Sequence, residues 1–246
     1  MTQRPHVILT LRRTGGTALT AFLGRVSTFP SMQHEPLNRD RIWGATTRGF
    51  RADDDTAALD TAMTEHLAKR PNIKHCVEVV PIAVTRALIE AGQAHDYRFL
   101  LLTRRDEARR LLSLYLAFAT GVWGLRAAQR IYPEILAGRR APKPIALDTV
   151  RGRIARDGAA LGRTLALLRH RRIAHDWLIF EELYEGAQSV EVQARRIAVD
   201  LGAEVPADDP RLAVLAQRGG QGSEHIAPHV PGAAELRELL DRLVVT

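Results

Sequence analysis

The chain has 246 residues, 46% of them hydrophobic, and its 35 Lys and Arg against 28 Asp and Glu give a formal net charge of +7. This length and apolar content suit one α/β domain over residues 1–246, and the charge favours an anionic partner without choosing between a nucleotide and a nucleic acid. One cysteine, Cys76, excludes an internal disulfide framework and a cysteine-rich zinc site. The apolar run before Arg12 is far shorter than the about 20 residues of a membrane span, so we expect a cytoplasmic protein without a transmembrane segment.

The segment from His6 to Leu23 has the pattern of a strand, a basic turn and the start of a helix. Its first residues, rich in Val, Ile and Leu without alternation, predict a strand covered on both faces of a parallel sheet. After the turn, Thr17 is the expected N-cap of a helix with its apolar residues three and four positions apart. The turn is therefore predicted to lie at a helix N-terminus.

Such a turn suits an anion, because unpaired backbone N–H groups and the positive end of the helix dipole converge there and glycines let the anion approach the backbone. The sequence matches neither the G-x-x-x-x-G-K-[ST] loop of nucleoside triphosphate enzymes nor G-x-G-x-x-G. Alone, it also fits an ordinary strand-to-helix turn with solvated arginines. The residues expected to hold an anion are Arg12, Arg13, Thr14, Gly15, Gly16 and Thr17.

Residues 29–50 show no convincing periodicity and contain several Pro and Gly residues, which predicts a long ordered loop of the kind that often serves function. Glu35 lies in this loop, where a carboxylate is usually only a solvated charge. Residues 54–70 then predict a helix, because apolar residues share one face and an Asp cluster opens the segment.

A second buried strand is predicted over residues 72–80, with Lys74 and His75 at its polar end. Pro81 and Gly92 have the positions expected at the first residue of a helix and just past its end. The alternation of strands and helices indicates a parallel sheet, in which ligands bind at the carboxyl ends of the strands.

The segment YRFLLLTRRDEARRLLSLYLAFATGVW, residues 97–123, repeats the pattern of strand, basic turn and helix. Residues 98–103 predict the strand, and Asp106 is the expected helix cap. Ser113 follows Arg105 within the helix, where a serine can also bond a carbonyl one turn earlier. Arg104 fits the position of a phosphate ligand nearly as well as Arg105, and the sequence leaves the two open.

Together, HVILTLRRTGGTAL, the HEPLN of residues 34–38 and the run from LTRRD to TGVW resemble sulfotransferases that use 3'-phosphoadenosine 5'-phosphosulfate (PAPS). The closest resemblance is to bacterial carbohydrate sulfotransferases of the trehalose 2-sulfotransferase and nodulation-factor sulfotransferase type, and it extends more weakly through residues 177–201. It implies a three-layer, P-loop-like sulfotransferase fold with a central parallel sheet flanked by helices. The chain departs from the family at Gly16, where a residue with a hydroxyl group is usual, and at Ala18, where an aromatic or other large residue is usual.

The resemblance also implies a reaction, in which a sulfuryl group passes from PAPS to a hydroxyl of a carbohydrate or glycolipid and leaves adenosine 3',5'-bisphosphate. The first loop would hold the 5'-phosphosulfate, and Arg104 or Arg105 with Ser113 the 3'-phosphate. Glu35 would be the general base and Arg13 would stabilise charge on the leaving oxygen. The resemblance also implies Lys74 as a contact for the substrate or the sulfuryl group, with His75 as the reserve base, and Arg218 closing over the nucleotide. His34 is expected to be a surface residue or a substrate contact, and Trp123 either stacks on a sugar or packs in the core. No metal is implied, and a homodimer is left open.

The rest of the chain continues the alternation of helices and strands. The expected elements are a basic linker over 138–146, an amphipathic helix over 148–170, a strand over 175–180, a helix over 188–201, coil over 203–232 and a closing helix over 235–245.

Two other classes of protein remain open. A kinase-like nucleotide enzyme would explain the basic turns, but the first loop lacks the lysine of that class. A nucleic-acid-binding module would explain the net charge, but aromatic residues are only 5% and stacking platforms are scarce, so we expect no nucleic-acid partner.

Overall fold

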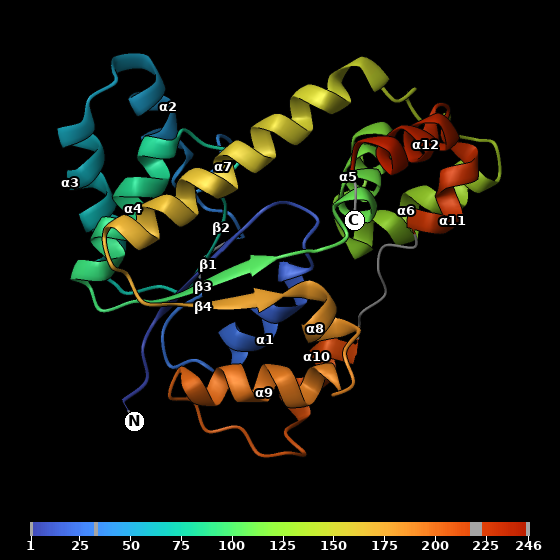
Figure 1. Ribbon diagram of the computed structural model, residues 1–246. Helices are drawn as coiled ribbons and strands as arrows, with labels where there is room; N and C mark the ends of the chain where they lie inside the picture. The colour runs from blue at the N-terminus through green and yellow to red at the C-terminus, as the bar shows by residue number, and fades with distance from the viewer. Residues whose placement is uncertain (1, 32–33, 217–222, 245–246) are drawn as a thin grey trace. The chain divides into compact units, whose positions relative to one another are not determined.

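A computed structural model describes residues 2–31, 34–216 and 223–244 (Figure 1). Its contacts divide the chain into two compact units. The first unit combines Met1–Thr103 with Arg156–Leu215, and the second combines Arg104–Ala155 with Ala216–Thr246. The two units are described separately below.

A parallel sheet of four strands forms the centre of the first unit, in the order β2-β1-β3-β4 (Figure 1). The strands are β1 (His6–Thr10), β2 (Ile73–Cys76), β3 (Arg98–Thr103) and β4 (His175–Ile179). All described pairings between them are parallel, and Ile8 of β1 lies opposite both Lys74 and Leu100. The predicted α/β class with a parallel sheet flanked by helices is thus confirmed, while the sulfotransferase fold itself stays a prediction.

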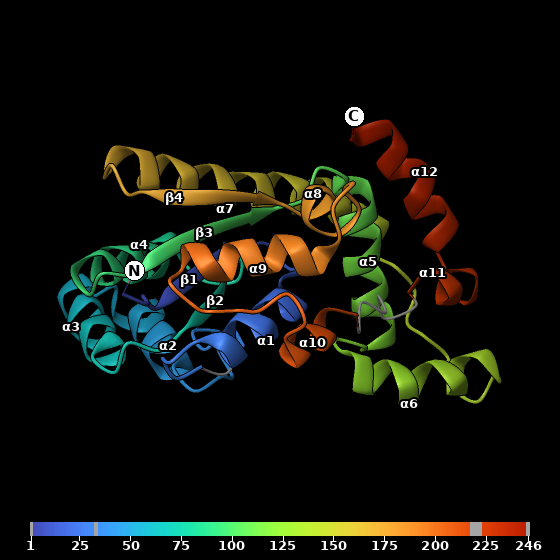
Figure 2. The ribbon, with the colours of Figure 1, turned by 90° about the horizontal axis from the view of Figure 1, so that it is seen from below.

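Helices cover both faces of this sheet, so alternate strand residues enter two different cores. Ile8 belongs to the core shared with α1 (Gly16–Val26) and α9 (Val190–Asp200), the helices nearest the viewer in Figure 2. Val7 and Leu9 belong to the opposite core, which includes apolar residues of three more helices. These are α3 (Thr56–Leu67), α4 (Ile82–Ala94) and the part of α7 (Val150–His170) that lies in the first unit.

The second unit is helical and has its own apolar clusters. Leu111 and Leu114 of α5 (Glu107–Thr120) pack with Leu236 and Leu240 of α12 (Ala233–Leu243). A smaller cluster joins α6 (Leu125–Leu136) to Ile226 at the end of α11 (Ser223–Ile226). No single described helix is long and apolar enough to cross a membrane; α5 and α6 pass that test only together, across a bend of 68°.

Several predicted boundaries agree with the structure and others do not. The prediction for β3 is confirmed, and β2 is shorter than the strand predicted over residues 72–80. The short elements are η1 (Leu147–Thr149), α8 (Phe180–Tyr184), η2 (Pro210–Leu212), α10 (Ala213–Ala216) and η3 (Ala227–His229). The last three, with α11, lie in a segment that was predicted as coil.

The prediction of a long ordered loop over residues 29–50 was wrong for its last part, because α2 (Gly44–Asp53) begins within it. This helix buries only Gly44 and Thr47, so it has no apolar stripe for a periodicity to reveal. Tertiary contacts hold it instead: the Thr47 hydroxyl donates to the Leu37 carbonyl, and Trp43 at its start stacks on His66 of α3.

Gly92 was expected just past the end of a helix, and that prediction was wrong as well. It is buried inside α4, where an added Cβ would lie 2.8 Å from the ring of Phe99. The glycine therefore serves a close helix-to-sheet approach and not a helix end.

Candidate functional site

The first candidate element is the β1–α1 loop, Leu11–Gly15, which follows the carboxyl end of β1. Gly15 is the N-cap of α1 and adopts φ 78°, a left-handed conformation that favours glycine. A Cβ at Gly15 would lie 2.6 Å from the Phe180 ring, and the Tyr184 hydroxyl donates to the Gly15 carbonyl at 2.8 Å. Helix α8 therefore packs directly on the loop and fixes its backbone.

The prediction of Thr17 as the N-cap was wrong. Helix α1 starts at Gly16, and Thr17 is an exposed residue of its first turn. The N-cap Gly15 provides no side-chain hydrogen bond to the first-turn N–H groups, and that turn contains no acidic residue. The helix N-terminus thus keeps the electrostatic character that attracts an anion.

The side chains of the loop differ in what they do. The Thr14 hydroxyl is buried and donates to the Leu11 carbonyl at 2.8 Å, so it shapes the loop. Both the backbone N–H and Nε of Arg12 donate to Glu78 Oε1, at 3.0 and 2.9 Å, which anchors the loop to the segment after β2. Arg13 is half-buried and adopts φ 69°. A left-handed backbone at a residue other than glycine is a strained feature that often marks functional sites.

The second candidate element is the turn that carries Glu35, and it meets β2 next to the β1–α1 loop. Lys74 Nζ donates to Glu35 Oε1 at 2.7 Å, and the Glu35 N–H donates to the Lys74 carbonyl at 3.2 Å. The side chain of Lys74 passes close to Gly16: a Cβ there would lie 3.1 Å from Lys74 Cε. The structure thus brings together Gly16, Lys74 and Glu35, three of the residues predicted for the site.

Glu35 is itself held in a fixed position. Its φ is 57°, again left-handed, and the Asn38 side-chain amide donates to its Oε2 at 2.6 Å. The Asn38 backbone N–H also donates to the Glu35 carbonyl at 3.0 Å, which closes the turn. Asn38 was not among the predicted site residues, although it lies within the HEPLN segment that carried the resemblance.

The surroundings of Glu35 strongly favour its ionised form. Burial acts to raise the pKa of Glu35, but the charge of Lys74 and hydrogen bonds from Lys74, Cys76 and Asn38 outweigh it and lower this pKa to about 2. Burial acts to lower the pKa of Lys74, and the acidic groups around it raise that pKa above its ordinary value. Burial raises the pKa of the Cys76 thiol, which therefore stays protonated and donates to the carboxylate. At neutral pH the pair is a charged carboxylate beside a charged ammonium group.

His34 lies beside this ion pair and is half-buried. Burial and then the charge of Lys74 lower the pKa of His34. Its Nδ1 is buried and has no hydrogen-bond partner among the described residues. The structure therefore places the predicted substrate contact within the same cluster as Glu35.

His75, the predicted reserve base, is not part of this cluster. It is fully buried, and its Nε2 is hydrogen-bonded to the Thr85 hydroxyl of α4 at 2.9 Å. Burial lowers the pKa of His75 to about 4. Because neighbouring strand residues face opposite sides of a sheet, Lys74 faces α1 while His75 faces α4. His75 is thus placed as a core residue away from the β1–α1 loop.

The second basic turn belongs to the second unit. Asp106 is confirmed as the cap of α5, since its carboxylate accepts from the Arg109 N–H at 2.8 Å. Arg104 is half-buried and Arg105 exposed, while Ser113 is half-buried in the second turn of the helix. Arg218, predicted to close over the nucleotide, lies outside the described residues.

Trp123 also belongs to the second unit. Its side chain is 46% exposed and meets the half-exposed Phe118 edge to face, with ring centroids 5.2 Å apart. The structure thus favours the open alternative in which Trp123 is a surface aromatic group over the one in which it is a core residue.

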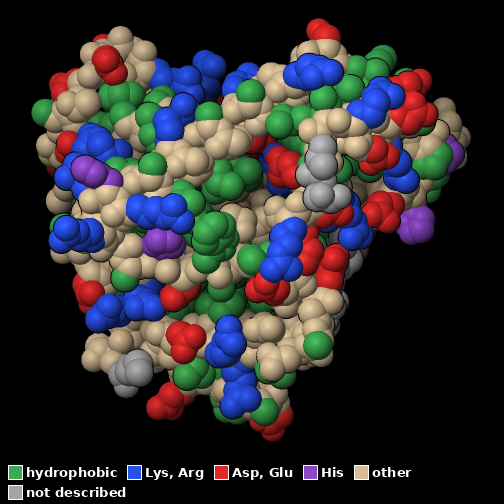
Figure 3. Space-filling view, viewed as in Figure 1, with side chains coloured by type: hydrophobic (Ala, Val, Ile, Leu, Met, Phe, Trp, Pro, Cys, Tyr) green, Lys and Arg blue, Asp and Glu red, His purple; other side chains and the backbone are tan. Residues whose placement is uncertain are grey.

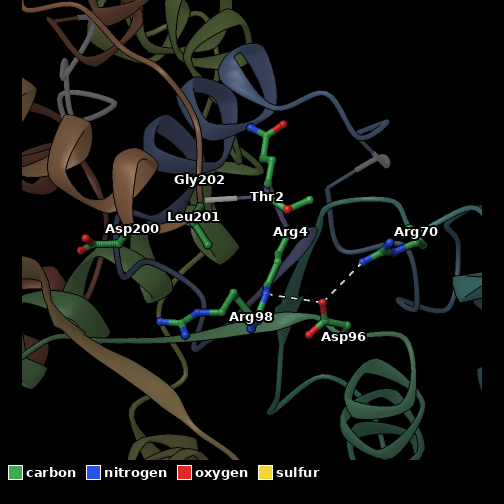
Figure 4. A pocket seen from close by; sticks show the side chains of 9 residues that line it. Thr2, Arg4, Arg70, Asp96, Arg98, Asp200, Leu201 and Gly202 are labelled. Carbon is green, nitrogen blue, oxygen red and sulfur yellow. Dashed lines mark ion pairs between the residues drawn. The ribbon is translucent and has the colours of Figure 1, made fainter.

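A separate cavity of about 520 Å³ lies at the amino ends of β1, β2 and β3, opposite the β1–α1 loop (Figure 4). Arginines line it, but carboxylates accompany them: Asp96 Oδ2 forms ion pairs with Arg4 at 3.4 Å and with Arg70 at 3.9 Å. Arg98 is paired with Asp176 at 2.9 Å. This balance of charges gives the cavity no clear preference for an anion.

On the face shown in Figure 3, Lys and Arg are interspersed with Asp and Glu. Within the described residues, no group of three or more His, Cys, Asp or Glu is placed to hold a metal ion. The β1–α1 loop with Lys74 and Glu35 is therefore the strongest candidate site.

No protein-family model matches the chain, and no curated protein matches its sequence at a significant level.

Proposed function

We propose that this protein transfers a sulfuryl group from PAPS to a hydroxyl of a carbohydrate or glycolipid in the cytoplasm. The observation that carries the proposal is the ion pair of Glu35 and Lys74, 2.7 Å long, beside the N-terminus of α1, which has no side-chain cap. It combines a group that can accept a proton with groups that can hold an anion, at the carboxyl end of a parallel sheet, where such folds bind ligands.

Each residue has a distinct role in this proposal. The first-turn N–H groups of α1, Arg13 and Thr17 hold the 5'-phosphosulfate, and Gly15 and Gly16 leave the backbone open to it. Arg12 and Thr14 act indirectly, by holding the shape of the loop. In the second unit, Ser113 with Arg104 or Arg105 holds the 3'-phosphate, and Trp123 is a contact for the acceptor.

The reaction is an in-line displacement at sulfur. The acceptor oxygen forms a bond to sulfur as the bond between sulfur and the phosphate oxygen breaks, and adenosine 3',5'-bisphosphate leaves. The hydroxyl proton passes to Glu35, and Arg13 stabilises the charge that grows on the leaving oxygen. As in phosphoryl transfer, most of the catalysis is then positioning and electrostatic stabilisation.

The test compares Arg13→Ala with Glu35→Gln. Adenosine 3',5'-bisphosphate at 100 times its Kd should stabilise the folded parent protein by about 2.7 kcal/mol, since it binds only the folded state. Arg13→Ala should weaken both this binding and sulfate transfer, because it removes charge that faces the ligand in the ground and transition states. Glu35→Gln should keep the binding and lose transfer by roughly 10² to 10⁴. Thermal melts, calorimetric titration and a sulfate-transfer assay on bacterial glycans measure these effects.

Two results would contradict the proposal. If ATP or AMP stabilises the protein as much as the bisphosphate does, the 3'-phosphate is not recognised, and ATP turnover would then favour a kinase-like enzyme. If Glu35→Gln transfers sulfate at the parent rate, the base is another residue. Salt-dependent binding to DNA with no binding to the bisphosphate would favour a nucleic-acid module.

A further inference from the structure

The ion pair of Glu35 and Lys74 raises a chemical question for the proposed reaction. A carboxylate with a pKa of about 2 is ionised at neutral pH but is a weak base, whereas an effective general base has a pKa nearer the working pH. The donors that stabilise Glu35 are Lys74, Asn38 and Cys76. Lys74 supplies the only full charge among these three, so its position has the largest electrostatic effect on the carboxylate.

Lys74 is also the donor that lies nearest the anion-binding part of the loop. Its Cε is 3.1 Å from the point where a Gly16 Cβ would be, and Gly16 is the first residue of α1. The absence of a side chain at Gly16 leaves the lysine beside the helix N-terminus. The Lys74 side chain is 8% exposed and that of Glu35 is 18%, so the pair is poorly screened by solvent.

We propose that Lys74 is a movable counterion, which pairs with Glu35 when the loop holds no anion and turns to the phosphosulfate when the loop binds it. The inference rests on the proposed function, because it requires a ligand anion at the loop and a proton acceptor at Glu35. It makes Lys74 a positioning residue for the base as well as a cation for the ligand. Binding of PAPS then raises the basicity of Glu35, so that a weak base becomes an effective one.

The direction of the effect follows from charge. When Lys74 moves toward the ligand, Glu35 loses its cation and gains an anionic neighbour, and both changes raise its pKa. The protein therefore takes up a proton as the ligand binds at mildly acidic pH. A return of the Glu35 pKa to its ordinary 4.5 corresponds to about a quarter of a proton at pH 5, and a further rise corresponds to more.

Other groups near Glu35 could take up protons too, and the experiment must separate them. The titratable groups that interact with Glu35 are His34 on its own turn and Lys74, His75 and Cys76 of β2. Three more charged groups act on these partners: Arg41 on His34, Glu78 on Lys74, and Arg12 through its ion pair with Glu78. His34 is the main competitor, because its pKa is lowered by burial and by Lys74, and a bound anion would raise it.

The experiment is calorimetric titration of adenosine 3',5'-bisphosphate at pH 5 in two buffers that differ in ionisation enthalpy, which counts the protons taken up. Glu35→Gln should bind the bisphosphate and take up at least about a quarter of a proton less than the parent. His34→Gln, the matched control, should take up as many protons on binding as the parent protein does. The double variant Lys74→Met with Glu35→Gln removes both charges together and should match Glu35→Gln in its proton count.

The possible outcomes separate the inference from the proposed function. If the parent and Glu35→Gln both bind the bisphosphate and take up equal numbers of protons, the ion pair of Glu35 and Lys74 stays closed on binding. This result overturns the proposal that Lys74 is a movable counterion, but it does not contradict sulfuryl transfer. If His34→Gln loses the proton uptake instead, the proton binds to His34, and the movable-counterion proposal is overturned in that case too. No binding of the bisphosphate by the parent overturns the proposed function, and the inference with it.

Discussion

The two strand–turn–helix segments look alike in sequence but differ in how their helices begin. In the first, Gly15 caps α1 through its backbone alone and leaves the first turn without an acidic group. In the second, Asp106 caps α5 with its carboxylate, and Glu107 adds another acid to the first turn. A carboxylate at a helix N-terminus accepts hydrogen bonds from the first-turn N–H groups and interacts favourably with the helix dipole, as a bound anion would.

The difference assigns different chemistry to the two turns. The first turn can offer an anion its backbone N–H groups together with Lys74, whereas the second can offer arginine side chains at a helix start that already holds an anionic group. Glu107 is further engaged, since it accepts two hydrogen bonds from the buried Arg110, at 2.6 and 2.7 Å. The proposed reaction uses this difference: it assigns the transfer step, which needs a preorganised oxyanion-type site, to the first turn and nucleotide anchoring to the second.

The largest expected effect comes from adding one methyl group at the first turn. Gly15→Ala combines a left-handed backbone with a contact to Phe180 that is too short, so we expect a loss of about 2–5 kcal/mol in unfolding free energy and loss of bisphosphate binding. Gly121→Ala, at the end of α5, has nearly the same φ and open space, and should cost only about 1–2 kcal/mol. Urea denaturation measures both. Equal losses would mean that packing of α8 on the loop contributes nothing.

A smaller effect is expected at the cap of the second turn. Asp106→Ala removes the acceptor for the Arg109 N–H and should lower the unfolding free energy by about 1 kcal/mol. Asp106→Ser keeps a capping oxygen and should recover most of this loss. Denaturation of the three proteins side by side tests the cap, and an Ala variant as stable as the parent would show that the two turns do not differ as described.

The smallest expected effect on stability comes from placing an acidic residue in the first turn of α1, where α5 has Glu107. Thr17→Glu places an acid in the exposed first turn of α1, so it should raise the unfolding free energy by about 0.3–1 kcal/mol. The same charge should weaken binding of adenosine 3',5'-bisphosphate roughly tenfold, through like-charge repulsion. Thr17→Gln, the neutral match, should leave the unfolding free energy unchanged and should weaken binding less than Thr17→Glu does, because it removes the Thr17 contact but adds no charge. Tighter binding by the Glu variant would place the anion away from this helix.

Local patterns in the sequence determined much of this protein. Buried strand segments gave β3 its limits, the position of Asp106 predicted a cap, and alternating elements predicted a parallel sheet. These features depend on residues close together in the chain, where backbone hydrogen bonding and hydrophobic periodicity act. The composition of residues 11–17 likewise identified a turn suited to an anion, and Glu35 and Lys74 entered the prediction through resemblance.

The tertiary structure alone decided how these residues meet. Glu35 and Lys74 are 39 residues apart in the chain, and no local pattern shows that their side chains pair at 2.7 Å or that Asn38 fixes the carboxylate. Strand alternation requires Lys74 and His75 to face opposite sides, but only the packing of α1 and α4 on those sides places Lys74 in the candidate site and His75 in the core. The reason is physical: a strand fixes the alternation of its side chains, while the elements that cover its two faces determine which side chains reach the site.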